Sequence, residues 1–307
     1  MILSVSRRTD IPAYYSEWFL NRLKEKYVLI ANPYNSDRLG RVELSPDSVD
    51  CIVFWTKNPA PMLGKLDAIE EMGYSFYFQF TLTPYGRDVE RNLPPKGELL
   101  QTFQNLSRRI GPERVVWRYD PVMITETFSI AWHLERFQEL CDKLYGVTSR
   151  CIFSFIDPYA HIGNEFHGMS REEMLAVAQG FSKIATEYQL PLFTCAEEID
   201  LSRFQIGHSA CIDRKLIEQI TGCPIKAKKD TGQRPACGCI ESVDIGAYDT
   251  CPNGCVYCYA TSSEKAMQRR VRAHDPFSPM LTGIPRGDEL ITDRTTPSQK
   301  ILQLSLF

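Results

Sequence analysis

Within the first 200 residues, short runs of β-branched and aromatic residues alternate with longer segments that carry apolar residues at helical spacing. The runs predicted as strands are Ile2–Ser6, Val28–Ala31, Cys51–Thr56, Phe76–Leu82, Val115–Tyr119, Cys151–Phe155 and Leu190–Thr194. The segments predicted as helices are Glu17–Lys26, Met62–Met72, Glu98–Ile110, Ile130–Leu144 and Arg171–Tyr188. Such alternation is typical of a parallel sheet covered by helices. Because no Gly-rich dinucleotide fingerprint follows a strand, we expect an α/β protein with a full or partial TIM-like (β/α) barrel.

Several predicted strands end in polar or charged residues. The carboxyl ends of the strands build the active site of a parallel barrel, so we expect a polar cavity at one mouth. Arg and Lys suit a carboxylate or phosphate ligand, although mutual pairing with nearby aspartates is an alternative interpretation. The candidate cofactor- or substrate-binding residues at these ends are Arg7, Arg8, Lys57, Thr81, Arg118, Asp120, Ser154 and Glu197.

Eight of the eleven cysteines lie between Cys195 and Cys258. Disulfides rarely persist in a reducing cytosol, so such crowding indicates metal or redox chemistry. The strongest pattern is Cys251-Pro-Asn-Gly-Cys255-Val-Tyr-Cys258, in which the thiols are spaced C-x3-C-x2-C. Three thiolates can hold a four-iron cluster and leave one iron without a protein ligand. The Asn-Gly pair permits a tight turn with positive φ that brings backbone amides to the sulfurs.

This loop resembles the cluster-binding loop of the radical S-adenosylmethionine superfamily, with Tyr257 at the position of its aromatic residue. The segments Phe54-Trp-Thr-Lys-Asn-Pro59 and Thr81-Leu-Thr-Pro-Tyr-Gly86 are similar to relatives of spore photoproduct lyase within that superfamily. The chain as a whole resembles an uncharacterised bacterial domain family with such a loop near its C-terminal end. The superfamily usually places the loop after the first barrel strand, whereas here Arg7-Arg8-Thr9-Asp10 occupies that position.

The resemblance implies a 4Fe-4S cluster on Cys251, Cys255 and Cys258, with S-adenosylmethionine bound to the fourth iron. One-electron reduction would then cleave the cofactor to a 5′-deoxyadenosyl radical. It further implies an electron donor such as ferredoxin or flavodoxin, and Tyr257 joins the candidate cofactor-binding residues. The substrate, the catalytic residues and the oligomeric state stay open.

Two alternatives compete with this interpretation. A zinc ion needs four ligands, and Cys237 or Cys239 could complete its shell, which would make the chain a zinc-stabilised barrel with a hydrolytic or binding function. A nucleic-acid-processing enzyme is suggested only by the resemblance to the lyase, and a formal net charge of −3 argues against it. A second metal site, for an auxiliary iron–sulfur cluster or zinc, is a further hypothesis for Cys195, Cys211, Cys237 and Cys239.

The alternation of strand-like and helix-like segments ends near residue 200. We expect residues 1–200 to form the barrel and residues 201–307 to form a cysteine-rich segment that packs over its mouth and does not fold alone. Two helices are predicted there, at Arg214–Ile220 and Ser262–Val271. Hydrophobic residues make up 43% and charged residues 24%, and neither a secretory signal nor a spanning segment is evident. These features predict a cytoplasmic protein without a membrane partner.

Overall fold

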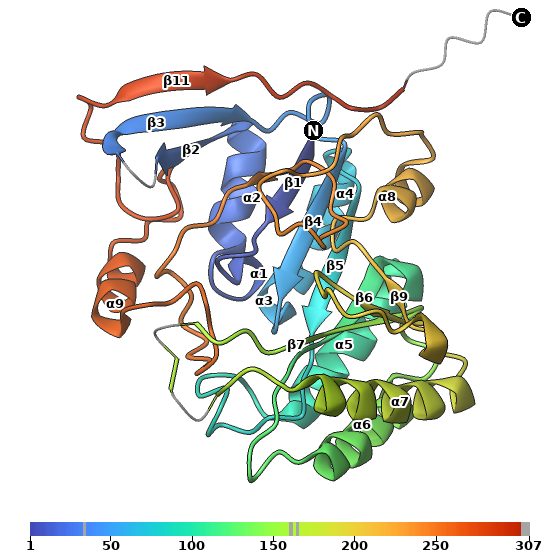
Figure 1. Cartoon of the computed structure of the whole chain (residues 1–307). Helices are drawn as coiled ribbons and strands as arrows, with labels where there is room; N and C mark the ends of the chain where they lie inside the picture. Colours follow the sequence, from blue (N-terminus) through green and yellow to red (C-terminus); the bar gives the residue numbers. More distant parts are fainter. Residues whose placement is uncertain (33–34, 160–161, 164–165, 302–307) are drawn as a thin grey trace, which may run out of the picture.

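The centre of the computed structural model is an eight-stranded sheet in which every neighbouring pair is parallel (Figure 1). The structure describes residues 1–32, 35–159, 162–163 and 166–301. The strand order is β10-β1-β4-β5-β6-β7-β8-β9, so the sheet has two open edges and is a partial barrel. Its strands are β1 (Ile2–Val5), β4 (Cys51–Thr56), β5 (Phe76–Thr81), β6 (Val115–Val122), β7 (Cys151–Phe155), β8 (Leu192–Thr194), β9 (Gly207–His208) and β10 (Val243–Asp244).

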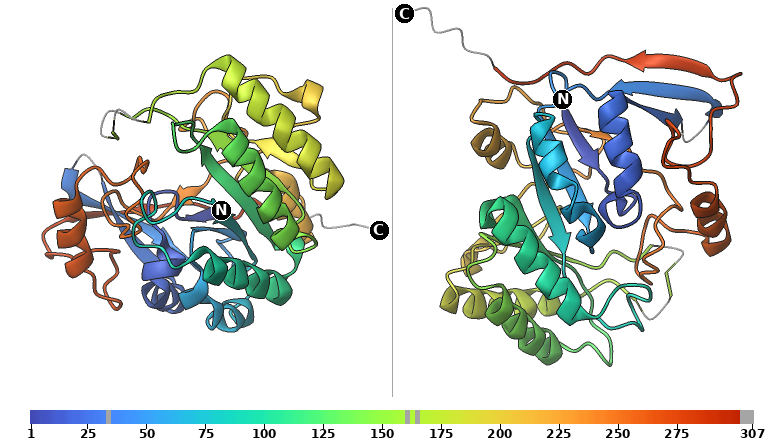
Figure 2. Two further views of the ribbon diagram at one scale, coloured as in Figure 1. Left: turned by 90° about the horizontal axis from the view of Figure 1, so that it is seen from below. Right: turned by 180° about the vertical axis from the view of Figure 1, so that it is seen from behind.

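Helices that connect the strands cover the outer face of this sheet (Figure 2). They are α1 (Ile11–Tyr14), α2 (Ser16–Glu25), α3 (Ala60–Leu63), α4 (Leu66–Glu71), α5 (Lys96–Ile110), α6 (Ile130–Leu144) and α7 (Arg171–Glu187). Further along the chain lie α8 (Arg214–Thr221) and α9 (Glu264–Arg272), and short 3-10 turns occupy Pro112–Arg114 and Ser202–Phe204. Side chains cap several amino ends: Ser129 caps α6, and Ser170 forms a capping box with Glu173 on α7.

The predicted helices are confirmed to within two residues at each end, with one exception. The segment predicted as a single helix, Met62–Met72, is divided into α3 and α4. Gly64 ends the first of them, consistent with the low helix propensity of glycine. Among the described residues, no helix combines the length and the apolar character needed to cross a bilayer.

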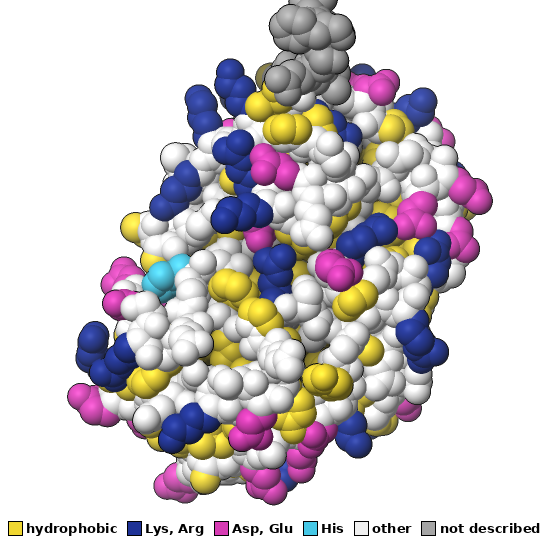
Figure 3. Space-filling model, turned by 90° about the vertical axis from the view of Figure 1, so that its right-hand side faces the viewer, with side chains coloured by type: hydrophobic (Ala, Val, Ile, Leu, Met, Phe, Trp, Pro, Cys, Tyr) yellow, Lys and Arg dark blue, Asp and Glu magenta, His cyan; other side chains and the backbone are white. Residues whose placement is uncertain are grey.

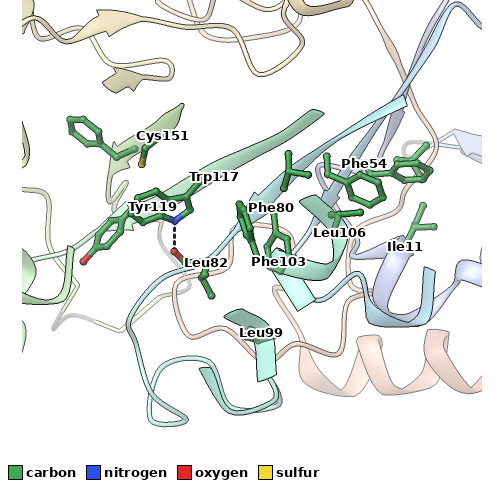
Figure 4. Close-up of a cluster of buried hydrophobic side chains, with 14 of the residues drawn as sticks. Ile11, Phe54, Phe80, Leu82, Leu99, Phe103, Leu106, Trp117, Tyr119 and Cys151 are labelled. Atoms are coloured by element: carbon green, nitrogen blue, oxygen red, sulfur yellow. Dashed lines mark hydrogen bonds between the residues drawn. The ribbon is translucent and has the colours of Figure 1, made fainter. Parts of the chain in front are cut away.

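Alternate side chains of the central strands enter two different cores. The outer core lies between the sheet and the helices, where Phe54, Phe80 and Trp117 pack among the side chains drawn in Figure 4. Trp117 is buried completely, and its indole nitrogen donates to the carbonyl of Leu82 at 2.9 Å, which satisfies its only polar group. Full burial of a large apolar side chain of this kind contributes about 1.5–3 kcal/mol.

The inner core lies on the concave face and is covered by the C-terminal part of the chain. Its strand residues are Ile2, Cys51, Val53, Tyr77, Val116 and Ile152. The residues that cover them are Cys211, Ile212, Leu216, Ile217, Ile225, Cys237, Cys239 and Ile240. Residues beyond 200 therefore fill the interior at the amino ends of the strands and also supply both edge strands, β9 and β10.

A second, three-stranded sheet packs beside the first and corrects one prediction. It contains β2 (Tyr27–Asn32), β3 (Asn35–Glu43) and β11 (Leu290–Arg294), with β2 antiparallel and β11 parallel to β3. The run Val28–Ala31 was expected to join the central sheet and instead belongs here. Only two residues separate β2 from β3, which suits antiparallel pairing, because a parallel neighbour needs a crossover of a dozen or more residues.

Candidate functional site

A cavity of about 460 Å³ opens at the carboxyl ends of the central strands. Every residue that the sequence singled out as a candidate ligand lines this one cavity. These residues are Arg7, Arg8, Lys57, Thr81, Arg118, Asp120, Ser154, Glu197, Tyr257, Cys195, Cys211, Cys237, Cys239, Cys251, Cys255 and Cys258. The two sets of cysteines, separate in the sequence, therefore share one cavity.

The alternation of side chains between the two faces of each strand explains how its polar residues reach the cavity. Inward-facing positions recur at every second residue. In β6, Val116 lies in the inner core and Arg118 and Asp120, further along, line the cavity. In β7, Ile152 lies in the inner core and Ser154 lines the cavity. The interior thus changes from apolar at the amino ends of the strands to polar at their carboxyl ends.

A partly buried hydrogen-bonded chain joins β6 to β7 on the cavity wall. Arg118 pairs with Asp120, and Asp120 in turn accepts from the hydroxyl of Ser154. Burial disfavours the charge of each partner, but the negative charges of Cys211 and Asp120 raise the pKa of Arg118, and Arg118 with the Ser154 hydroxyl lowers the pKa of Asp120. Both groups are therefore held in their charged forms.

A second buried network lies beside the C-x3-C-x2-C loop. Lys57 donates from Nζ to Glu90 Oε1 and to the hydroxyl of Tyr257, each at 2.8 Å. Glu90 also pairs with Lys96 and accepts from Tyr257. Burial opposes ionisation of Glu90, yet the charges of Lys57 and Lys96 outweigh it and lower its pKa to about 2. The single carboxylate of Glu90 thus neutralises part of the positive charge of Lys57 and Lys96 next to Cys255.

The loop that carries Cys251, Cys255 and Cys258 is fixed to the first half of the sheet. Asn253 accepts from the hydroxyl of Tyr14 at 2.8 Å and donates to Asp10 Oδ2 at 3.1 Å. Its backbone carbonyl accepts from the amide of Asn92 at 3.1 Å. All three cysteines are partly exposed and free of disulfides.

Gly254 allows this loop to approach the chain closely. Its φ is +67°, and a β-carbon there would come within 2.9 Å of Asn92 Nδ2. The positive φ predicted for the Asn-Gly turn is therefore confirmed. Further along, the thiol of Cys258 accepts from the amide of Ala260 at 3.4 Å, so a backbone donor is directed at one sulfur.

Two aspartates hold the segment that follows β1. Asp10 caps α1 and accepts from the Thr56 hydroxyl and the Lys57 amide, both at 2.7 Å. Asp244, in β10, accepts from the hydroxyls of Ser4 and Ser6 at 2.8 and 2.7 Å. The amide of Arg7 also donates to Asp244, at 2.9 Å. These contacts orient the Arg7-Arg8 segment at the cavity.

The remaining candidates have individual partners. Arg8 lies over the ring of Tyr248, with 5.1 Å between its guanidinium carbon and the ring centroid. Glu197 accepts from the amide of Phe155 at 2.9 Å, and burial raises its pKa to about 7. Arg234, which was not among the candidates from the sequence, pairs with Asp157 at 2.5 Å and lines the cavity.

Four thiols from three segments also meet at the cavity wall. The sulfurs of Cys195 and Cys211 are 2.8 Å apart. Hydrogen bonds from Cys211 and Cys237 lower the pKa values of Cys195 and Cys239, and the same bonds raise the pKa values of the two donors. As the side chains stand, no group of three or more His, Cys, Asp or Glu among the described residues could hold a metal ion.

Sequence reasoning missed Glu90 and Asp244, which organise two sides of the site. Glu90 lies in an irregular segment after β5, and Asp244 lies in a strand of two residues. Neither position has a motif or a periodic neighbourhood. The one signal for Glu90 is indirect, because a buried Lys57 beside thiolates requires an anionic partner.

Comparison with known proteins gives a family but no activity. The model of a family described as a domain of unknown function, DUF1848, matches residues 2–260. No curated protein sequence matches the chain. Among solved structures, the fold search returns a protein from Bacteroides thetaiotaomicron provisionally assigned as an alpha-L-fucosidase, with 15% identity and a TM-score of 0.28. That match covers 52% of this chain and 66% of the other, just under two thirds of its length, and carries no argument.

Proposed function

The chain belongs to the DUF1848 family, and we propose that it is a radical S-adenosylmethionine enzyme. In this proposal Cys251, Cys255 and Cys258 hold a 4Fe-4S cluster, and the C-terminal segment forms a metal-binding cover over the mouth of the partial barrel. The single observation that carries the proposal is that all three thiols, on a loop with a positive-φ glycine, line the cavity at the strand ends.

The donor set fits a cluster with one open iron. Three cysteines within eight residues supply soft thiolate ligands. The nearby Lys57 provides positive charge beside Cys255, and the amide of Ala260 donates to the sulfur of Cys258. Positive charge and hydrogen bonds of this kind tune the potential of a cluster. When bound, the cluster supplies one electron for reductive cleavage of S-adenosylmethionine at the open iron.

The polar wall of the cavity would bind and orient the cofactor and an unknown substrate. Arg7 and Arg8 offer donors suited to a carboxylate. Asp120, with Ser154, and Glu197 offer acceptors suited to hydroxyl or amino groups. The cover formed by residues beyond 200 would exclude water from this space and hold the target atom close to its reaction partner.

Location and partners follow from the same chemistry. Eleven free cysteines persist in a reducing compartment, so we place the protein in the cytoplasm, with a ferredoxin- or flavodoxin-type protein as the electron donor. On the face shown in Figure 3, Lys and Arg side chains are interspersed with Asp and Glu. Because binding to a phosphate backbone depends on a continuous basic surface, we do not extend the proposal to nucleic acid.

Anaerobic reconstitution tests the proposal. The reduced full-length chain, with S-adenosylmethionine, should contain about four iron and four sulfide at this site and should produce 5′-deoxyadenosine. Cys255→Ala should abolish both the cluster and the product. Cys223→Ala is the matched control, because Cys223 is also partly exposed but lies outside the cavity lining, and it should retain both. Zinc without sulfide in the wild type, or no 5′-deoxyadenosine, would support the zinc-stabilised barrel instead.

A further inference from the structure

Four thiols outside the C-x3-C-x2-C loop, those of Cys195, Cys211, Cys237 and Cys239, form a closed ring of contacts. Cys195 follows β8 directly, Cys211 precedes α8, and Cys237 and Cys239 lie in the loop before β10. Cys195 and Cys239 each interact with both Cys211 and Cys237. Three segments that are distant in the sequence therefore converge at these four thiols, beside backbone hydrogen bonds such as that from the amide of Ile240 to the carbonyl of Ile212 at 3.3 Å.

Packing in the inner core explains the burial of three of these thiols but not the contacts among all four. Cys211 and Cys239 are each 2% exposed and Cys237 is 5% exposed. Thiols are weak hydrogen-bond donors and acceptors, so four of them contribute little when buried together. The 2.8 Å between the sulfurs of Cys195 and Cys211 is also too long for a disulfide bond, which spans about 2.05 Å.

The surroundings of the ring carry compensating positive charge. Arg118 donates from Nη1 to the sulfur of Cys211 at 2.7 Å. Arg7 lies beside Cys239, and its Nη2 atom is buried without a hydrogen-bond partner among the described residues. A divalent ion with four thiolates carries a net charge of −2, which the guanidinium groups of Arg7 and Arg118 offset in part, since Arg118 is also paired with Asp120.

The spacing of the sulfurs indicates which metal would fit. Four ligands around one zinc ion at about 2.3 Å place their sulfurs about 3.7 Å apart. The Cys195–Cys211 pair would open by about 1 Å to reach that spacing. A cubane cluster separates its cysteines much further, because each of them binds a different iron. The mutual contacts of the ring therefore favour a single ion. The amide of Ile212, which donates to the sulfur of Cys239 at 3.3 Å, also suits a metal-bound thiolate.

We propose that Cys195, Cys211, Cys237 and Cys239 bind one tetrahedral Zn²⁺ ion that closes the open side of the partial barrel. The chain between β9 and β10 crosses from one edge of the sheet to the other, and three of the four ligands lie on it. The fourth ligand, Cys195, anchors this crossing to β8. Four protein ligands leave no open position, so the ion is architectural and not catalytic. The proposal does not depend on the function proposed above.

Metal analysis of variants of the full-length chain separates the two cysteine sets. The wild type should retain about one zinc per chain in the presence of a competing chelator. Cys239→Ser should lower zinc retention at least about tenfold and leave the iron and sulfide of the other set unchanged. Cys255→Ala should lose iron and sulfide and retain zinc, and Cys223→Ser should match the wild type. Zinc retention that is unaffected by Cys239→Ser, or a loss of iron and sulfide in that variant, would overturn the proposal.

A measurement on the unmutated chain guards against misfolding of the variants. Replacement of zinc by Co²⁺ in the wild type should give the intense visible ligand-field bands of a tetrahedral site together with thiolate charge-transfer bands. Titration of accessible thiols should show four cysteines that are protected until the metal is removed. Weak octahedral cobalt bands, or four thiols that react equally before and after metal removal, would contradict a four-thiolate zinc site.

Discussion

The Nζ atom of Lys57 lies 2.8 Å from the hydroxyl oxygen of Tyr257, although the two residues are 200 positions apart in the chain. Lys57 follows β4, Tyr257 belongs to the C-x3-C-x2-C loop, and both contact the buried carboxylate of Glu90. A charge network therefore joins the loop to the central sheet. The stability of the fold and the position of the loop depend on the same three groups.

Replacement of Lys57 by Met removes one of the two cations that hold Glu90 ionised. Removal of one partner from a buried ion pair costs about 3–5 kcal/mol, because the other charge stays buried. Lys96 still contacts Glu90, so we expect a loss of about 3 kcal/mol in the free energy of unfolding. Urea unfolding at neutral pH measures it. The double variant Lys57→Met with Glu90→Gln should recover part of the loss, and no recovery would show that the pairing is not its cause.

Substitution of Gly254 by Ala tests the close approach of the cysteine loop. The left-handed φ alone costs an alanine about 1–2 kcal/mol, and the added methyl group would also displace the side chain of Asn92. We expect lower iron incorporation on reconstitution, with the fold retained. Gly283→Ala is the matched control, since Gly283 has a φ of +75° and open space around it. Equal iron incorporation in the two variants would contradict a role for the approach to Asn92.

Much of the central sheet follows from local sequence. The five predicted strands that became β4 to β8 are rich in apolar residues, and they pair in the order in which they follow one another along the chain. The strands β9 and β10 have only two residues each, so they carry no periodic signal and exist through their partners. The polar segment Asn35–Glu43 becomes a strand for the same reason, because pairing with β2 and β11 outweighs its weak propensity.

The site divides in a similar way. The cysteine motif and the polar strand ends could be predicted from the sequence, because residue type and spacing alone identify them. The partners of these residues were not visible. Glu90 reaches Lys57 only because an irregular segment folds under the loop, and Asp244 reaches Ser4 only through the pairing of β10 with β1. Such contacts depend on tertiary structure that no local pattern encodes.

Asp244→Ala should loosen the C-terminal part of the chain from the first strand. The carboxylate accepts hydrogen bonds from Ser4, Ser6 and the amide of Arg7, and bonds to a charged group contribute about 1.5–3 kcal/mol each. We expect a loss of about 3 kcal/mol in the free energy of unfolding and faster amide hydrogen exchange at β10. Asp293→Ala, at an exposed ion pair of 3.8 Å with Arg41, should change stability by less than about 0.5 kcal/mol. Unchanged exchange at β10 would contradict the role of Asp244.

His133 should make the fold sensitive to mild acid. Its ring is fully buried, with Nδ1 2.8 Å from the Tyr119 hydroxyl and Nε2 2.9 Å from the Met123 carbonyl, and burial lowers its pKa from 6.5 to about 4. Between these two values the unfolded chain binds a proton that the folded chain does not, so stability falls as the pH falls. The contribution of His133 is complete above pH 6.5, and we expect it to fall by about 2 kcal/mol between pH 7 and pH 5. Glu197, whose pKa is raised to about 7, changes stability in the opposite sense over the same range, so the contribution is measured as a difference between wild type and variant. In urea unfolding, the stability of His133→Gln relative to the wild type should rise by about this amount from pH 7 to pH 5, whereas that of the exposed His167→Gln should stay constant; parallel pH profiles for wild type and His133→Gln would rule out His133 as the source.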